Sequence, residues 1–396
     1  MPPARIDGLA MDAKPQPRHP AAMSEANTDF QAALLTVRLG AIAANYRTYR
    51  RLAGPAAVAA VVKADGYGLG ASCIAPALAE AGCDGFFVAR LEEAIALRTI
   101  SPRARIFVLD GAPADAVPAL ISRRLTPVLN SLSDIAAWSA AANVGHHVLD
   151  AVVHVDTGMN RLGLPGHELA VLSAESAKRL LGLNLVLVMS HLACSDDPAN
   201  KLNGEQLSRF RQALAMLPPA PASLAASHGA MLGPDYHFDL VRPGVALYGA
   251  NPQAAEGGIA WPSPNLMQTV AVLTARVLQL RRIDSGESVG YGATFRAKRP
   301  TMLATIALGY ADGFPRALSN KGVAVVGGVR VPIVGRISMD LTILDVTDMP
   351  EPPHVGDAVE LLGDHVGLGE VSALAGTNEY EILTRLRRVP KVYMGS

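Results

Sequence analysis

The run AVVKADGYGLG (60–70) places a lysine at the end of an apolar segment. Lys63 follows strand-like residues, and the glycines at 66, 68 and 70 permit close backbone approach and unusual dihedral angles. In a partly desolvated pocket, a lysine amine can lose its proton and form a Schiff base with a carbonyl compound. The alternative is a lysine whose stem packs at the strand end while its amine reaches water. This run alone leaves both interpretations open.

Other polar residues follow later apolar runs in the same way. Arg161 lies in VDTGMNRLG, His191 in VMSHLACSD, Ser227 next to His228, and Arg242 in VRPGVALYG. A single polar residue after a strand is usually an ordinary loop residue. With Lys63 included, five apolar runs are followed by such a residue. This repetition indicates a shared site, because the carboxyl ends of parallel strands in a barrel meet at one rim.

Eight short apolar runs must position these residues. They lie at 56–63, 84–90, 105–111, 125–131, 148–158, 183–191, 221–229 and 239–249. Helix-like segments separate them, for example at 91–98, 131–142, 168–180 and 204–216. The runs are too short for helices and lack strict alternation, which is typical of strands covered on both faces. Eight such units predict a (β/α)8 barrel of the TIM type, and a doubly wound open sheet is the alternative.

The composition of the sequence changes after residue 249. A Pro-rich passage at 252–264 is interpreted as a linker, and Val/Ile/Thr-rich segments follow at 267–280, 301–309, 323–335 and 341–346. Helices are expected only at 368–375 and 379–388. We therefore predict an α/β chain with a disordered tail at 1–30, a barrel at 31–262 and a mostly β domain at 263–396. The early apolar segment 33–37 does not belong to the series of eight predicted barrel strands, and it is a candidate to pair with the second domain.

Composition excludes several classes of protein. Lys plus Arg equals Asp plus Glu at 35 each, so no basic surface for nucleic acid is expected. The cysteines at 73, 83 and 194 show neither a paired framework nor metal-ligand spacing, which favours a reducing compartment. The first thirty residues lack the apolar run of a signal peptide, and no membrane span is expected. The prediction is a cytoplasmic protein without bound metal, nucleic acid or membrane.

Six motifs occur in a fixed order along the chain. They are AVVKADGYGLG, VDTGMNRLG, VRPGVALYG, VGYGATFR, IALGYADG and VGRISMDL. With them, the chain from about 35 to 392 strongly resembles alanine racemases, pyridoxal-phosphate enzymes of the barrel type. The resemblance implies a barrel plus a β domain, pyridoxal 5′-phosphate as cofactor, and a homodimer with shared active sites. It also implies interconversion of L-alanine and D-alanine, which would supply D-alanine for peptidoglycan in the cell wall.

The resemblance also implies residue roles. Lys63 matches the lysine that carries the cofactor, Arg161 the arginine near its phenolic oxygen, His191 the histidine under its ring, and Arg242 the arginine facing its pyridine nitrogen. The expected phosphate group is held by Tyr67, Ser227, Gly244, Val245 and Tyr380. Substrate would meet Arg161 and, from the partner subunit's second domain, Met339, Tyr310 and Asp340. The second-domain Tyr291 completes the expected site.

Racemisation needs two acid–base groups on opposite faces of the substrate Cα. Lys63 is expected to serve one face and Tyr291 the other. A phenol has an ordinary pKa of about 10, so it needs cationic or hydrogen-bonding neighbours to act near neutrality. A relay through His191, linked by Arg242 to the cofactor, is the hypothesis. An arginine at the pyridine nitrogen donates a hydrogen bond and leaves that nitrogen unprotonated, which limits transamination.

Two residues depart from what the family commonly carries. His154 stands where a carbamylated lysine is common; it either packs and hydrogen-bonds, or an anion such as chloride binds beside Arg161. His228 is a bulky ring near the expected phosphate group, and it either adds a donor or lines the wall. A broad-specificity amino-acid racemase on the same scaffold is the nearest alternative. A non-catalytic barrel that carries the cofactor is a further one.

Overall fold

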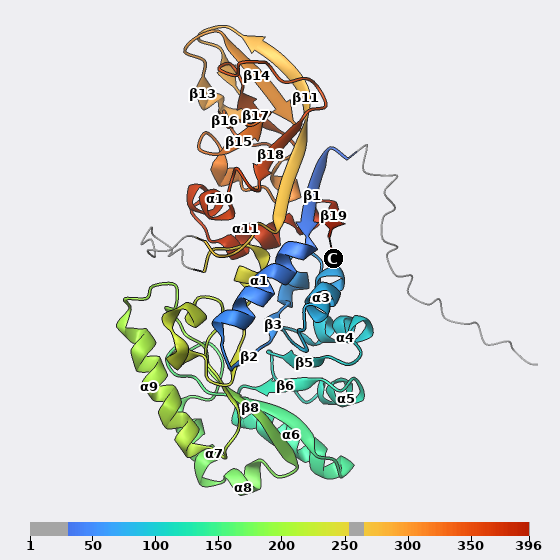
Figure 1. The fold of residues 1–396 in the computed structure, drawn as a ribbon, viewed down its shortest axis with the longest axis vertical. Helices are drawn as coiled ribbons and strands as arrows, with labels where there is room; N and C mark the ends of the chain where they lie inside the picture. The colour runs from blue at the N-terminus through green and yellow to red at the C-terminus, as the bar shows by residue number, and fades with distance from the viewer. Residues whose placement is uncertain (1–30, 253–264, 396) are drawn as a thin grey trace, which may run out of the picture. The chain divides into compact units, whose positions relative to one another are not determined.

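A computed structural model describes residues 31–252 and 265–395 of the chain. The predicted tail at 1–30 and most of the predicted linker lie outside these residues, so the domain boundary near residue 262 stays a prediction. In Figure 1 the N-terminal domain runs from blue to yellow and the C-terminal domain is orange and red. None of the helices in the described ranges has the length and apolar character needed to cross a membrane.

The N-terminal domain is a closed parallel barrel. Its strands are β2 (Ala57–Val58) with β3 (Ala60–Val61), β4 (Gly85–Val88), β5 (Arg105–Val108), β6 (Thr126–Leu129), β7 (Leu149–His154), β8 (Leu183–Met189), β9 (Ala222–Ser223) and β10 (Leu240–Val241). Strands β3 to β9 pair in sequence order, and β10 pairs with β2. A bridge between Ala226 and Arg242 joins the last two strands and closes the ring. The predicted barrel is therefore confirmed and the open-sheet alternative is wrong.

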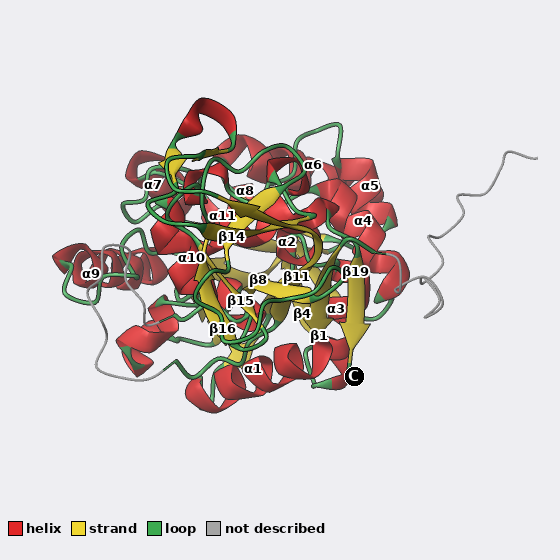
Figure 2. Ribbon diagram, turned by 90° about the horizontal axis from the view of Figure 1, so that it is seen from above, coloured by secondary structure: helices red, strands yellow, loops and turns green. Residues whose placement is uncertain are grey.

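Helices cover the outside of the barrel (Figure 2), and a separate cluster of buried apolar side chains comes from its strands. This cluster consists of Ala59, Phe87, Phe107, Val128, Val152, Leu187, Met189 and Leu240. The covering helices are α3 (Ala71–Glu80), α4 (Leu91–Ile100), α5 (Val117–Ser122), α6 (Leu132–Gly145), α7 (Gly166–Ala174), α8 (Ser176–Arg179) and α9 (Lys201–Met216). Because both faces of each strand are buried, the runs are continuously apolar, as the sequence indicated.

The C-terminal domain is built on an eight-stranded sheet. Its strands are β11 (Ala271–Ile283), β14 (Thr301–Ile306), β15 (Val323–Val326), β16 (Val329–Pro332), β17 (Thr342–Asp345), β18 (Ala358–Leu362), β19 (Lys391–Met394) and β1 (Ala33–Arg38). Two short strands, β12 (Ser288–Val289) and β13 (Phe295–Arg296), form a separate hairpin. Helices α10 (Leu368–Ala375) and α11 (Glu379–Arg385) lie where they were predicted. The sequence reading missed β18 and β19.

Strand β1 belongs to this second sheet, although it precedes the barrel in the chain. It pairs antiparallel with β11 and parallel with β19 (Figure 1). The expected pairing of the segment 33–37 with the second domain is confirmed, and the predicted barrel limit at residue 31 is corrected for these residues. Helix α1 (Leu39–Leu52) then leads from the sheet to the barrel. The chain thus passes between the two domains twice, once before the barrel strands in the sequence and once after them. These two passages connect the domains.

The two domains meet at the first barrel loop, which carries Lys63. Tyr393 of β19 donates a hydrogen bond to the carbonyl of Leu69 at 3.0 Å. A Cβ on Gly68 would lie 3.0 Å from the carbonyl oxygen of Leu383 in α11. Gly68 also has a φ of 81°, a left-handed conformation that glycine adopts without strain. This close packing brings the start of α11 to the rim of the barrel.

Candidate active site

A cavity of about 390 Å³ opens at the carboxyl ends of the barrel strands. Every residue predicted to bind the cofactor lines it: Lys63, Tyr67, Arg161, His191, Ser227, Arg242, Gly244, Val245 and Tyr380. His154 and His228, the two departures noted in the sequence, line it as well. The other lining residues were not predicted, and they are Val61, Phe87, Leu109, Leu162, Met189, Ser195, Ala226 and Asn378. Most of these follow from the closing of the barrel rather than from a local motif.

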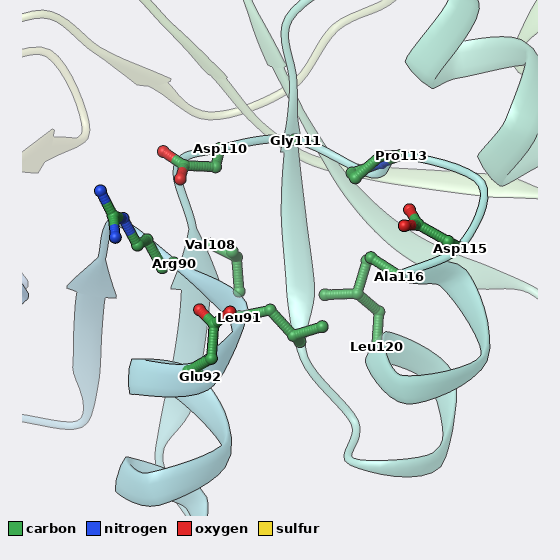
Figure 3. Close-up of a pocket in the computed structure, with 10 residues that line it drawn as sticks. All are labelled: Arg90, Leu91, Glu92, Val108, Asp110, Gly111, Pro113, Asp115, Ala116 and Leu120. Atoms are coloured by element: carbon green, nitrogen blue, oxygen red, sulfur yellow. The ribbon is translucent and has the colours of Figure 1, made fainter.

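A second, shallower pocket of about 310 Å³ lies at the rim between β5 and the starts of α4 and α5 (Figure 3). Asp110 and Asp115 lie on opposite sides of it, with Leu91 and Leu120 between them. It contains no residue that the sequence singled out for chemistry. Asp110 nevertheless belongs to the charged surroundings of Lys63.

Lys63 begins a tightly wound turn, α2 (Lys63–Tyr67). Ala64, Asp65 and Gly66 have φ values of 54°, 55° and 61°. Two of these are not glycine, so the turn stores backbone strain of about 1–3 kcal/mol per residue. Glu93 holds the strained turn in place: one carboxylate oxygen accepts from the N–H of Ala64 at 2.5 Å. The two-residue strand β3 and the short turn α2 thus present the amine to the cavity at a fixed point.

The amine of Lys63 is unusually acidic for a lysine. Burial lowers its pKa, and the nearby cation of Arg161 lowers it further. Glu93 and Asp110 act in the opposite direction. Because burial and the Arg161 cation outweigh the two carboxylates, a larger fraction of the amine is unprotonated near neutral pH than for an ordinary lysine. An unprotonated amine is what nucleophilic attack on a carbonyl requires.

Backbone and hydroxyl groups gather at the other end of the cavity. The Ser227 hydroxyl accepts hydrogen bonds from the N–H groups of Gly244 at 2.8 Å and Ala246 at 3.4 Å. Tyr49 donates to the Ser227 carbonyl at 2.9 Å, which fixes that segment from behind. Burial raises the pKa of Tyr67, so its hydroxyl stays neutral and able to donate. Such a set of neutral donors suits a phosphate group.

Replacing Gly244 with alanine is expected to weaken this end of the site. The new Cβ would lie 2.2 Å from the Tyr67 hydroxyl oxygen, so the tyrosine ring must move. Overpacking of this kind costs about 1–3 kcal/mol. We expect a roughly tenfold or larger loss in pyridoxal-phosphate affinity, measured by fluorescence titration, corresponding to about 1.4 kcal/mol or more.

The matched control is Gly204→Ala in α9, where a Cβ would meet no atom within 4 Å. That variant should gain about 0.5–1 kcal/mol of stability from helix propensity and keep its cofactor affinity. Equal affinities for the two variants would contradict the assignment of Gly244 to the phosphate end.

Arg242 and His191 lie together at the floor of the cavity. The buried guanidinium of Arg242 donates to the hydroxyl of Ser223, and to the carbonyl of Ser190 at 2.7 Å. Burial lowers the pKa of Arg242 to about 9, which leaves it a cation at neutral pH. Burial, together with the charges of Arg242 and Arg161, lowers the pKa of His191 well below its ordinary value. His191 is therefore a neutral ring beside a fixed cation.

His154 is also neutral, and its tautomer follows from its neighbour. The Asn130 side-chain amide donates to the carbonyls of Leu109 at 2.9 Å and Val128 at 3.0 Å. Its oxygen therefore faces Nδ1 of His154, 2.8 Å away, so that nitrogen must carry the hydrogen. Burial, with the charge of Arg242, lowers the pKa of His154 to about 4. The first interpretation of His154, a hydrogen-bonded ring, is what the structure contains; the bound anion stays a hypothesis.

Nitrogen NMR tests the state of His154. We expect ¹⁵N shifts of a neutral ring with hydrogen on Nδ1, unchanged from pH 8 down to about 5, because the folded-state pKa is near 4. His365, whose pKa is raised by its hydrogen bond with Glu360, should titrate in the same spectra and serves as an internal reference. A His154 signal that moves between pH 7 and 6, or a ring with hydrogen on Nε2, would contradict this arrangement.

Tyr380 reaches the cavity from the second domain. It lies in the first turn of α11, and its hydroxyl is 3.4 Å from Nδ1 of His228. The two rings are stacked with centroids 6.4 Å apart. His228 therefore lines the wall of the cavity together with Tyr380, and a contact between His228 and a phosphate stays a prediction.

The remaining predicted residues do not line this cavity. The side chain of Tyr291 is 72% exposed, and those of Tyr310, Met339 and Asp340 are exposed as well. The loops that carry Tyr310 and Met339 lie against each other, because Ala311 donates to the Met339 carbonyl at 2.9 Å. Tyr310 and Met339 thus lie together on the second domain, and all four residues are exposed, as expected if they act in another subunit.

Arg336 is a neighbour of Tyr291 that sequence reasoning missed. A Cβ on Gly292 would lie 3.0 Å from a guanidinium nitrogen of Arg336, so this cation packs beside the Tyr291 turn. The turn itself requires glycine on both sides, since Gly290 and Gly292 have φ values of 70° and 72°. Arg336 lies inside the motif VGRISMDL, so the sequence contained the signal, but nothing local linked it to a residue 45 positions earlier.

The fold and the cavity together define a class of protein. An amine at the end of the first barrel strand, a fixed arginine and a set of neutral phosphate donors are the features of a barrel-type pyridoxal-phosphate enzyme. Residues 37–252 match the family described as alanine racemase, N-terminal domain, and residues 270–393 match alanine racemase, C-terminal domain. The chain therefore belongs to the alanine racemase family, and the predicted resemblance and fold class are confirmed.

Relatives and solved structures agree with this membership. The catabolic alanine racemase of Agrobacterium fabrum is 48% identical over 356 residues, 89% of this chain and 90% of that protein. The alanine racemase of Rhodospirillum rubrum is 45% identical over 371 residues, 93% of this chain and 97% of that protein. The crystal structure of alanine racemase from Bartonella henselae with covalently bound pyridoxal phosphate has a TM-score of 0.86 at 43% identity, covering 92% of this chain and 99% of that one. The predicted enzyme class and cofactor are those of the family.

Proposed function

We propose that this chain interconverts L-alanine and D-alanine with pyridoxal phosphate bound through Lys63. The observation that carries the proposal is the cavity itself. It places a desolvated amine, a fixed guanidinium and the Ser227–Gly244 donor set around one space of about 390 Å³. The residues fit the cofactor chemically: Lys63 suits its aldehyde, the donors near Gly244 its phosphate, and Arg242 its pyridine nitrogen.

The bound cofactor supplies an electron sink that stabilises negative charge at the substrate Cα. The protein supplies the proton transfers. Lys63 moves a proton to or from one face of Cα, and its lowered pKa keeps the amine available as a base. Arg242 remains a cation at neutral pH and would donate a hydrogen bond to the ring nitrogen of the bound cofactor, which would keep that nitrogen unprotonated. Side reactions that need a stronger sink, such as transamination, are thereby held back.

The second proton transfer is assigned to Tyr291 of the partner subunit in a homodimer. Two observations support this assignment. Tyr291 and the Tyr310–Met339 group are exposed on the second domain, and that domain leaves the cavity of its own chain open to solvent. Arg336 packs against the Tyr291 turn and places a cation beside it. The hypothesised relay through His191 and Arg242 would act across the same interface. The neutral ring of His191 beside the cation of Arg242 agrees with this relay. Tyr291 of the same chain, however, does not line the cavity that holds them.

A direct assay tests the proposed function. The purified protein, loaded with pyridoxal phosphate, should show the absorbance band of a cofactor bound to lysine and should convert L-alanine to D-alanine until the two are equal. Serine, lysine and arginine assayed in parallel separate an alanine racemase from the broad-specificity alternative. A protein that binds the cofactor without exchanging the Cα proton of any amino acid would be the non-catalytic carrier instead.

The proposed role is supply of D-alanine for peptidoglycan in the cytoplasm, where free thiols such as Cys73, Cys83 and Cys194 persist. Some relatives are named catabolic alanine racemases, for example that of Mesorhizobium japonicum at 46% identity. A catabolic role is therefore a second candidate. Disruption of the gene distinguishes the two: a biosynthetic enzyme leaves cells dependent on added D-alanine, whereas a catabolic one leaves them unable to grow on D-alanine as carbon source.

A further inference from the structure

A buried glutamine lies behind the floor of the cavity. Gln206 of α9 is 0% exposed, and its side-chain amide is fully hydrogen-bonded. Its oxygen accepts from the N–H of Ala193 at 2.8 Å, and its nitrogen donates to the His191 carbonyl at 3.0 Å and the Thr157 hydroxyl at 3.1 Å. One side chain on an outer helix thus fixes the segments that follow β7 and β8.

Gln206 is connected to the guanidinium of Arg242 through Thr157 and Ser190, with the hydroxyl of Ser190 on one side of the link and its carbonyl on the other. The Thr157 and Ser190 hydroxyls lie 2.8 Å apart, and the carbonyl of Ser190 accepts from Arg242 at 2.7 Å. The other arm of Arg242 donates to Ser223, whose hydroxyl donates to the Leu240 carbonyl at 2.5 Å. The guanidinium therefore cannot turn without breaking a buried hydrogen bond, and each such break costs about 1–3 kcal/mol.

We propose that Gln206 is a positioning residue that fixes Arg242 and the backbone of His191 at the cofactor ring, and so restrains transamination. This proposal deepens the proposed function and rests on it. Thr157, Ser190 and Gln206 are all buried, and none of them lines the cavity, so they reach the reaction only through Arg242 and His191. Buried networks of this kind are worth more than their separate bonds, because each member fixes the next.

The same helix carries a matched control. Asn203 is 2% exposed, and its amide donates to the carbonyls of Cys194 at 3.1 Å and Asp197 at 2.8 Å. It holds the loop beyond β8 but has no hydrogen bond to His191, Thr157 or Arg242 among those of the described residues. Removing either amide should cost comparable stability, about 1–3 kcal/mol. Only the removal of Gln206 disturbs Arg242.

The test compares Gln206→Met with Asn203→Leu in the cofactor-loaded protein. Both should unfold at lower temperature than the wild type. We expect Gln206→Met to raise the ratio of transamination to racemisation of alanine by about tenfold. This is the size of effect typical of residues that orient a reactive group without touching the substrate themselves. Asn203→Leu should keep the wild-type ratio. An unchanged ratio in Gln206→Met, or an equal rise in both variants, would overturn the proposal.

A measurement on the cofactor-free protein separates failure of this proposal from failure of the proposed function. In ¹⁵N-arginine-labelled protein, the two arms of Arg242 should give distinct, slowly exchanging signals in the wild type and in Asn203→Leu. They should merge or broaden in Gln206→Met, because the restraint on rotation is lost. If the wild type fails to racemise alanine but the Arg242 signals merge only in Gln206→Met, the proposed function is wrong while Gln206 still fixes Arg242. Identical Arg242 spectra in all three proteins would refute the positioning role whatever the activity.

Discussion

Lys63→Ala is expected to lose both racemisation and covalent cofactor. Without the amine there is no group to attack the aldehyde and no base on one face of Cα. General acid–base catalysis alone accounts for about 10²–10⁴-fold, and loss of the covalent attachment adds to it. We expect turnover to fall by at least about 10⁴-fold. The fold should persist, because the Lys63 backbone turn is held by Glu93 rather than by the lysine side chain.

Borohydride reduction followed by peptide mapping measures the attachment directly. In the wild type, the reduced cofactor should be recovered on the peptide that contains Lys63, and in Lys63→Ala it should be absent. Lys391→Met is the matched control. Burial also lowers the pKa of Lys391, but its amine donates to the Arg387 carbonyl at 2.7 Å and lies outside the cavity. If reduction labelled Lys391 as readily as Lys63, low pKa rather than location would explain the chemistry, and the assignment of Lys63 would be wrong.

The barrel and its polar rim were predictable because their signals are local. Each strand is a short apolar run, and each site residue on the rim directly follows one, so the eightfold count brought Lys63, Arg161, His191, Ser227 and Arg242 together without knowledge of any contact. Parallel strands all end at the same rim, and this single geometric rule converts a linear pattern into a cavity. The resemblance then added Tyr67, Val245 and Tyr380, whose roles no local pattern indicates.

The residues that the sequence reading missed depend on contacts between distant segments. Gln206 is one polar residue within an amphipathic helix, and its importance appears only when α9 packs behind β7 and β8. Asn130 determines the tautomer of His154 from 24 positions away in the chain. Strand β19 was missed because only four residues, Lys391–Met394, form it, and its partner β1 lies at the other end of the described chain. Such pairings follow from tertiary packing, which overrides local propensity.

Tyr291→Phe is expected to reduce turnover by about 10²–10⁴-fold while leaving the fold intact. The side chain is 72% exposed, so loss of its hydroxyl should change the stability by less than about 0.5 kcal/mol. Because Lys63 still serves one face of Cα, exchange of the Cα proton with solvent deuterium should persist for one enantiomer of alanine and nearly vanish for the other. Tyr236→Phe, a partly exposed tyrosine outside the cavity, should leave both exchange rates at the wild-type level.

Mixing two inactive proteins decides whether Tyr291 acts in its own chain or in a partner. If the sites are shared, a hybrid dimer of Lys63→Ala and Tyr291→Phe contains one site with both residues intact and one site with neither. Random pairing makes half of the dimers hybrids, each with one working site of two, so an equal mixture should regain about a quarter of the wild-type activity. If Tyr291 served the cavity of its own chain, every site in every dimer would lack one base, and the mixture would stay inactive. Tyr291 is exposed and is not among the residues that line the cavity of its own chain, which is the reason that we expect recovery.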